Sequence, residues 1–554
     1  MDNGLAVTAS AAKISGDGYV DGLQFSGVNY FLNVSKVIND NHKLSFNVIG
    51  AKQTHGQRFN RTTIAGNRAT EQGGQRFNLD WGYRNGQVEN SSFNFYHKPQ
   101  ISLNHDWVIS DRTFLTTVAY VSYGSGGGRR LDNSADGELN IGKAEYRLGG
   151  ADQPIDIDNI VALNRANGAL GAEAYLRASR NDHSWFGALS TLKTDLTDNL
   201  SFVGGVDLRS YVGKHFSEVT DLLGADYAFD NNNVNNPNAA LQVGDKRDYW
   251  NDGEVGWQGL FTQLEYDKDN LAGFVSAAIS NTSYTRIDYF NYLDTDALQT
   301  TDKYNFTGFS VKGGANYNIN EEHNVFANIG YFEKAPGFDA VFLQFDNEHI
   351  NADAKNQKIF STELGYGFKG SKLGANVNIY RTEWKDRTLT RSFPNQDGSF
   401  NSANILGVNA IHQGVEVDFT YRPSDKLTVT GMLSLGDWKW DNNLENVQIY
   451  DDSQNLVQTV NLFIAGLKVS ESAQTTAALG FDYELMDKTN FTVDYNYFAD
   501  IYASYDPNSR GSVGPQAWQL PDYGTFDMSL RHGFKIAGLD TTLTGRMNNV
   551  FDTQ

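Results

Sequence analysis

Apolar and polar residues alternate along many segments of this chain, and very short polar turns separate pairs of such segments. In one of them Val415, Val417 and Phe419 alternate with Glu416 and Asp418. Successive side chains of a strand point to opposite faces, so this segment has one apolar face and one charged face. The same period of two recurs along the chain, for example in segments 375–380 and 526–531.

The turns and the longer connections divide the chain regularly. Short turns rich in Asp, Asn, Gly and Ser, which tolerate the dihedral angles of tight hairpins, occur at 39–42, 110–112, 197–199, 268–270, 320–323, 369–371, 423–426, 486–489 and 536–539. Long polar segments lie between them, at roughly 54–90, 124–180, 214–256, 288–303, 334–357, 385–410, 439–469 and 503–521. Short turns at one end and long loops at the other are typical of outer-membrane barrels, whose long loops face outward.

The expected strands are long. They run to roughly 10–14 residues, whereas soluble strands average about 5–6 and a tilted strand crosses a bilayer with about 9–11. A soluble propeller or a tandem of sandwiches is the alternative, but no fixed period of blades is present. The pattern therefore predicts an all-β fold, a large antiparallel transmembrane β-barrel over residues 1–554.

Counting the turns predicts the size of the barrel. Nine turns give about eighteen strands, and segment 5–14 adds one, for roughly nineteen. Bacterial barrels usually have an even strand number with both chain ends on the periplasmic side. The directions of the first and last strands then predict about twenty-two strands in total, with the barrel incomplete at both ends.

Composition and charge narrow the partners. The chain has 54 Gly and only 9 Pro, and its 34 Phe and 28 Tyr favour strands. It has no Cys, which excludes disulfides and thiolate metal sites. The mean hydropathy is −0.48, and no run of 18 apolar residues suggests a transmembrane helix. A net charge of −21 argues against nucleic acid as a partner.

Several short motifs carry a family resemblance. They are residues 520–527 and 547–552 near the end, 324–328, 334–338 and 411–417 in the middle, and 30–36 and 55–58 at the front. In this order and spacing they resemble the barrel of TonB-dependent outer-membrane receptors. The resemblance implies that the family's last strand, with its terminal aromatic residue, would follow Gln554, in agreement with the strand count.

The resemblance implies an active importer. A scarce ligand (a metal chelate, cobalamin, an oligosaccharide or a peptide) would bind the outer loops and a plug, and the TonB complex would pull on a segment before residue 1. Other expected partners are outer-membrane lipid and lipopolysaccharide, and a surface lipoprotein if the ligand is a glycan or peptide. A passive channel or adhesion barrel is the first alternative, and a secreted β-rich binding protein the second. No enzyme motif and no cofactor site stands out.

Candidate ligand contacts are the aromatic residues Trp250, Trp257 and Trp518, which lie in predicted outer loops. Their rings could stack on sugars or on a chelate ring, but such residues as often pack loop against loop. Other aromatic residues near strand ends are expected in the two interface girdles: Tyr120, Tyr123, Trp384, Trp438, Trp440, Tyr495 and Tyr497.

Two further motifs have simple interpretations. The glycine-rich segment 124–130 lacks the features of a phosphate-binding loop, so a flexible outer loop is expected. Asp152, Asp156 and Asp158 form an acidic cluster without the glycine and closing glutamate of a calcium loop. A solvated surface is expected there, with adventitious calcium as the alternative.

Overall fold

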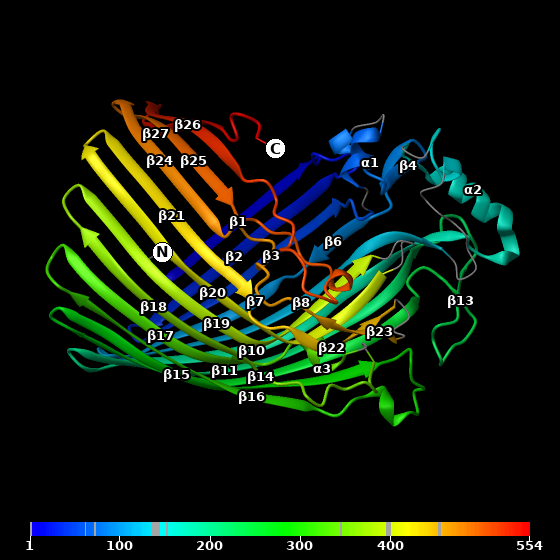
Figure 1. The fold of residues 1–554 in the computed structure, drawn as a ribbon, viewed down its shortest axis with the longest axis horizontal. Coiled ribbons are helices and arrows are strands. Elements are labelled where there is room, and N and C mark those ends of the chain that lie inside the picture. Colours follow the sequence, from blue (N-terminus) through cyan, green and yellow to red (C-terminus); the bar gives the residue numbers. More distant parts are fainter. Residues whose placement is uncertain are drawn as a thin grey trace.

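The computed structural model describes residues 3–60, 63–70, 74–133, 144–150, 153–343, 346–394, 400–451 and 456–553. One sheet of 22 strands curves into a barrel wall, and short helices and two small sheets lie at one end of it (Figure 1). No helix of the described part of the chain is long and apolar enough to cross a membrane.

Nineteen strands form the wall, each antiparallel to its neighbour in chain order. They are β1 (Leu5–Gly16), β2 (Phe25–Asn39), β3 (His42–Gly56), β7 (Gln100–Ser110), β8 (Thr113–Asn133), β10 (Ala174–Thr197), β11 (Leu200–Asp221), β14 (Lys246–Lys268), β15 (Leu271–Asp288), β16 (Tyr304–Asn318), β17 (His323–Lys334), β18 (Gln357–Lys369), β19 (Leu373–Pro394), β20 (Phe400–Ser424), β21 (Leu427–Trp440), β24 (Thr475–Met486), β25 (Thr489–Ala499), β26 (Tyr523–Ile536) and β27 (Leu539–Met547). The predicted number of strands is therefore confirmed.

The other three strands of the sheet are extensions of this wall. β6 (Phe93–His97) continues the line of β7 between β3 and β8, and Pro99, which has no N–H to donate, stands at the break. The hairpin β22 (Leu444–Tyr450) and β23 (Leu456–Leu462) lies beside the first residues of β20, where Ser402 pairs with Tyr450.

Smaller elements occupy the long loops. They are α1 (Ile64–Ala69), η1 (Gly74–Arg76), β4 (Trp81–Arg84), β5 (Gln87–Asn90), η2 (Ala144–Tyr146), β9 (Ile155–Asp156), α2 (Ile157–Asn167), η3 (Gly168–Leu170), β12 (Ala228–Asp230), β13 (Ala239–Leu241), η4 (Ala297–Gln299), α3 (Phe338–Val341) and η5 (Pro507–Ser509).

All nine predicted short turns join consecutive wall strands and lie at the left in Figure 1, whereas the long loops lie at the right. Asp269 and Lys488, both in such turns, adopt φ of 51° and 59°. This left-handed conformation matches the twist of the flanking strands in tight hairpins. The two ends of the barrel are thus built as the sequence predicts.

The alternation of the sequence places large apolar side chains on the outer face of the wall. On β14 Leu260 and Leu264 are 60% and 44% exposed, and their neighbours on β15, Ile279 and Val275, are 52% and 61% exposed. A soluble protein would bury such a continuous apolar surface, but in a bilayer it contacts acyl chains. Residues of the opposite parity, such as Glu265, face the lumen.

The strands are longer than predicted. β10 has 24 residues and β20 has 25, because the wall continues beyond the lipid-facing band. The expectation of a flexible loop at 124–130 is wrong, since these residues lie within β8. A Cβ on Gly126 would lie 2.7 Å from the Cβ of Tyr96, and one on Gly124 would lie 2.3 Å from the His183 ring. The glycines therefore make room for side chains of neighbouring strands.

The described ladders run without a break from β1 to β27. No ladder joins β1 to β27 among the residues that the structure describes. The expected total of about twenty-two strands stays a prediction.

Candidate ligand-binding site at the loop end of the barrel

The segment between β17 and β18, which contains α3, packs over the lumen. Tyr284 on β15 has the opposite parity to the lipid-facing Ile279, so its ring points inward. It contacts Phe338 edge to face, with ring centroids 5.6 Å apart and an angle of 81°. Tyr304 of β16 contacts Phe342 in the same way at 5.9 Å. This segment therefore narrows the mouth of the barrel.

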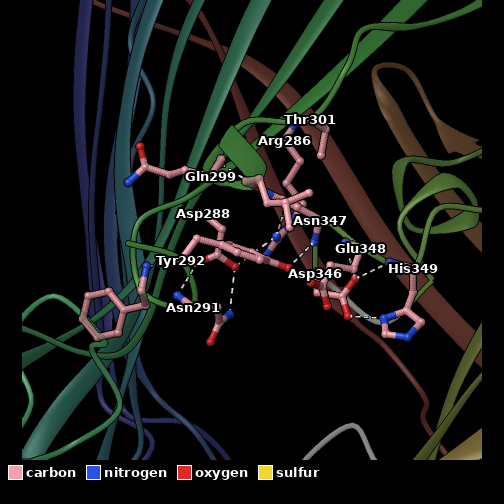
Figure 2. A network of polar contacts seen from close by, with 12 residues as sticks. Arg286, Asp288, Asn291, Tyr292, Gln299, Thr301, Asp346, Asn347, Glu348 and His349 are labelled. Atoms are coloured by element: carbon pink, nitrogen blue, oxygen red, sulfur yellow. Dashed lines mark hydrogen bonds and ion pairs between the residues drawn. The ribbon is translucent and has the colours of Figure 1, made fainter. Parts of the chain in front are cut away.

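A buried network of polar contacts fixes one side of this mouth (Figure 2). The guanidinium of Arg286 donates to Asp288 at 3.0 Å and to the Asn347 side-chain oxygen at 2.7 Å. The side chains of Arg286 and Asp288 are only 3% and 2% exposed. Asp288 also accepts from Asn291, and the Asn347 N–H donates to the hydroxyl of Tyr292. The network joins the loop after β15 to the loop that contains α3.

The loop that contains α3 also contacts the wall further along, at β19 and β20, which follow β18 in the sheet. The hydroxyl of Thr390 on β19 donates to Asp339 of α3. The side-chain amide of Asn404 on β20 donates to the backbone oxygen of Leu343 at 2.6 Å. The segment is thus held between β15 and the β19–β20 hairpin, so its position depends on both sides.

A cationic and aromatic cluster lies on this second side, and we call Trp384, Arg387, Arg391, Trp440 and Tyr505 the arginine–tryptophan patch. The guanidinium of Arg387 lies 4.3 Å from the ring centroid of Trp384 and 5.6 Å from that of Trp440. Trp440 in turn contacts Tyr505 edge to face at 6.4 Å. Stacking on indole rings holds a guanidinium in place without neutralising its charge.

The parity of the strands places the tryptophans of the patch on the lumen side. Trp384 is five residues beyond the lipid-facing Ile379 on β19, and therefore on the opposite face. Its indole N–H donates to Gln357 at 3.0 Å. Trp440 is five residues beyond the exposed Leu435 on β21 and is 2% exposed.

The charge of the patch is not balanced locally. Within the described ranges, no carboxylate forms an ion pair with Arg387 or Arg391. The Nε of Arg391, the indole nitrogen of Trp440 and the hydroxyl of Tyr505 are buried without a hydrogen-bond partner. Burial raises the pKa of the Tyr505 hydroxyl, so this group remains a neutral donor. Two arginines without a carboxylate partner suit an anionic ligand with acceptor oxygens.

Comparison with known proteins gives the family. Residues 29–550 match the family model described as TonB dependent receptor-like, beta-barrel. The chain belongs to the TonB-dependent receptor family. It is therefore the barrel of an outer-membrane receptor of a family that takes up ligands with energy supplied through TonB, and that consists of receptors and transporters rather than enzymes.

Solved structures of this receptor fold resemble the chain over almost its whole length. The ferric-catecholate import receptor Fiu of E. coli K12 in its closed form has a TM-score of 0.65 at 13% identity, and the match covers 99% of this chain and 73% of Fiu. The ferric citrate transporter FecA in its unliganded form has a TM-score of 0.66 at 11% identity, and the match covers 100% of this chain and 69% of FecA. BauA, the ferric preacinetobactin receptor from Acinetobacter baumannii, has a TM-score of 0.61 at 10% identity, and the match covers 99% of this chain and 71% of BauA. At these identities the likeness shows the fold alone. The comparison with curated proteins gives no match.

The structure separates the three tryptophans that the sequence suggested as ligand contacts. Trp250 and Trp257 lie on β14 of the receptor wall, so their expected place in a loop is wrong; the strand extends beyond the membrane band. Trp257 faces the lumen 5.7 Å from the guanidinium of Arg209, and its indole nitrogen is buried without a partner. Trp250 pairs in register with Phe216 and contacts Tyr289, with ring centroids 4.5 Å apart and a tilt of 36° between the rings.

Trp518 lies in the loop before β26, as expected, and is 66% exposed. It is not part of the arginine–tryptophan patch as described. The structure thus brings none of the three predicted tryptophans together, and their roles in binding stay predictions.

Four of the residues expected in the interface girdles instead face the lumen. Trp384, Trp438 and Trp440 have the opposite parity to their lipid-facing neighbours, and Tyr120 contacts the inward Trp185 edge to face at 5.5 Å. Their girdle assignment is wrong because closeness to a strand end does not fix the face of the sheet. Counting residues along each strand from a lipid-facing neighbour could have shown from the sequence that these side chains face the lumen. The outward Tyr123 and Tyr495 are 58% and 42% exposed.

The acidic cluster has structural roles where it is described. Asp156 accepts from the N–H of Asn159 and caps α2, and Asp158 accepts from the N–H of Asn85. Asp152 lies outside the described residues. Among those that are described, no group of three His, Asp or Glu side chains could hold a metal ion.

Proposed function

We propose that this receptor takes up an anionic chelate with planar aromatic groups, of the ferric-chelate class, and binds it at the arginine–tryptophan patch. The observation that carries the proposal is the unbalanced charge of Arg387 and Arg391 in a chain of net charge −21. Guanidinium groups recognise carboxylate and catecholate oxygens, while indole rings stack on the planar parts of such a ligand.

An oligosaccharide is the second candidate, because aromatic rings also stack on sugars. Neutral sugars need no excess of positive charge, so the patch favours the chelate. The structural resemblance to Fiu, FecA and BauA, whose names refer to ferric ligands, supports the same class. A passive channel would not need a mouth narrowed by the loop with α3.

The proposal includes energy coupling and a membrane setting. The TonB complex would act through a plug and a TonB segment, while bilayer lipid surrounds the outer face of the wall. The barrel itself would bind and pass the ligand and would catalyse no reaction.

A binding titration tests the proposal. The chain in detergent micelles is titrated with a ferric tris-catecholate complex and, separately, with a neutral maltooligosaccharide, and quenching of tryptophan fluorescence is followed. We expect saturable binding of the anionic chelate, and an affinity at least about tenfold weaker in the double variant Arg387→Gln/Arg391→Gln, because each charged hydrogen bond contributes roughly 1.5–3 kcal/mol.

The matched control is Arg381→Gln/Lys385→Gln, which removes the same charge from β19 at positions outside the patch. It should bind the chelate as the unmodified chain does. Equal weakening by both double variants, or saturable binding of the oligosaccharide alone, would contradict the proposal.

A further inference from the structure

Two histidines lie side by side on the outer face of the receptor wall, near its short turns. His42 is the first residue of β3, and His105 lies on β7, which pairs with β3. Side chains two or four residues apart along a strand point to the same face, so His42 shares the face of Phe46. For the same reason His105 shares the face of Leu103. Phe46 and Leu103 are 40% and 50% exposed on the lipid-facing side, so the two imidazoles lie at the short-turn boundary of the apolar band.

The two rings are in direct contact. Nδ1 of His42 lies 3.0 Å from Nε2 of His105, so one ring donates a hydrogen bond to the other. The ring centroids are 5.2 Å apart, with an angle of 11° between the rings. Trp107, which pairs in register with His42, stacks on the His42 ring with centroids 5.5 Å apart. These contacts hold the two nitrogens next to each other, which reduces the entropy that a shared ligand would have to overcome.

The distance between the two nitrogens matches that of two imidazole ligands on one metal ion. With metal–nitrogen bonds of about 2.0–2.1 Å, two ligands at a right angle place their nitrogens about 2.9 Å apart, and two ligands at the tetrahedral angle about 3.3 Å apart. The observed 3.0 Å is closer to the right angle. Square-planar and tetragonal coordination by nitrogen and oxygen is typical of Cu²⁺ and Ni²⁺, and Cu²⁺ binds such ligands most tightly among the first-row divalent ions.

Two other histidines near the short turns lack this arrangement. Nδ1 of His323 lies 2.6 Å from the hydroxyl of Tyr366, and Nδ1 of His532 lies 2.8 Å from the hydroxyl of Thr489. Each is thus a single imidazole beside a hydroxyl group, whereas copper and nickel prefer a second imidazole. His323 and His532 therefore provide a matched control for the pair.

We propose that His42 and His105 form a binding site for a divalent metal ion of the copper and nickel class, with Cu²⁺ bound most tightly. On binding, the donor ring moves its proton to its other nitrogen, so each neutral imidazole keeps one N–H and both facing nitrogens offer a lone pair. Rotation about the Cβ–Cγ bonds, which is a soft torsion, turns these lone pairs toward the ion, and water fills the remaining positions. The ion would stabilise the wall, because only the folded chain brings β3 and β7 together. The site lies on the opposite face from the arginine–tryptophan patch, so it is independent of the proposed chelate.

The experiment titrates the chain, without a histidine tag, with Cu²⁺ alone in detergent micelles and records electron paramagnetic resonance spectra. We expect one tightly bound ion per chain, with nitrogen hyperfine splitting from two imidazoles and a raised thermal midpoint. In His42→Gln/His105→Gln the affinity should fall at least about tenfold, since loss of even a group that only orients a ligand costs this much.

The control variant His323→Gln/His532→Gln also removes two imidazoles near the short turns, but not a pair, and should bind Cu²⁺ as the unmodified chain does. Heat-modifiable gel mobility checks that all variants fold. Equal affinity of the two double variants would overturn the proposal. A spectrum of the unmodified chain with a single coordinated imidazole would also overturn it, and this result needs no variant at all.

Discussion

Two groups of arginines lie at the mouth of the barrel, and they differ in how their charge is balanced. Arg286 is buried against Asp288, and its contact with Asn347 links it to a second loop. Arg387 stacks beside two indole rings, and neither Arg387 nor Arg391 forms an ion pair in the part of the chain that the structure describes. Burial and charge are common to both groups, so neither property marks a ligand site by itself. Because Arg286 is paired with a carboxylate, we assign it a structural role at the mouth. Because Arg387 and Arg391 are not, we assign them to ligand recognition.

The largest effect should come from breaking the paired group. Asp288→Ala leaves the Arg286 charge buried without its carboxylate, which costs about 3–5 kcal/mol. We expect the loops around 289–303 and 346–356 to lose protection by that amount, as measured by hydrogen exchange with mass spectrometry.

Asp294→Ala in the same loop is the control, because Asp294 is exposed, and its effect should stay below about 1 kcal/mol. Unchanged protection in Asp288→Ala would show that the network does not hold the mouth and that Arg286 is not a structural arginine.

A smaller effect should separate charge from stacking in the arginine–tryptophan patch. Arg387→Lys keeps the positive charge but loses the planar group that stacks on Trp384. We expect the affinity for the ferric tris-catecholate to fall by about 1 kcal/mol, roughly fivefold, with the thermal midpoint unchanged. If instead the midpoint dropped and the affinity did not, the residue would belong with Arg286 as a structural arginine.

A buried carboxylate in the long connection between β3 and β7 predicts a dependence of loop stability on pH. Asp80 accepts from the N–H groups of Phe59 and Asn60, and burial raises its pKa above the ordinary 3.8. Its ionised form is therefore disfavoured in the folded loop. The loop should be most stable below pH 3.8 and should lose stability as the pH rises through the raised pKa.

Hydrogen exchange of residues 57–60 and 78–80 between pH 4 and 7, corrected for intrinsic rates, measures this change. Asp80→Asn should remove the pH dependence. A loop that instead became more stable with rising pH would contradict the assignment.

The smallest effect is expected at Trp518. Because its side chain is 66% exposed, Trp518→Ala should change stability by less than about 0.5 kcal/mol and leave chelate affinity unchanged. A loss of affinity as large as that of Arg387→Gln/Arg391→Gln would move the binding site from the patch to the outer loops.

The sequence predicted the wall well because a membrane barrel repeats one rule. The period of two and the hairpin residues identified nine turns and nineteen strands without any tertiary information. The prediction from the sequence was wrong for the part of the wall that extends beyond the lipid. Outside the lipid neither face of the wall has to be apolar, so the alternation of apolar and polar residues is lost. For this reason the sequence predicts loops at residues such as Trp250 and Gly126, which lie on strands.

The mouth was harder to predict for a different reason. The contact between Arg286 and Asn347 joins residues 61 positions apart, and no local pattern encodes it. The inward face of Trp384 follows from strand parity, but Arg387 comes after an irregularity in the β19–β20 register, which parity cannot cross. The unpaired charge of the patch is therefore visible only in the folded chain.

The position of a bound chelate tests the central claim most directly. Crystals of the chain grown with a ferric tris-catecholate would locate the iron by its anomalous scattering. We expect iron on the lumen side of the wall, next to Arg387 and Arg391. Iron bound elsewhere on the barrel, or no bound iron at concentrations that saturate the fluorescence change, would contradict it.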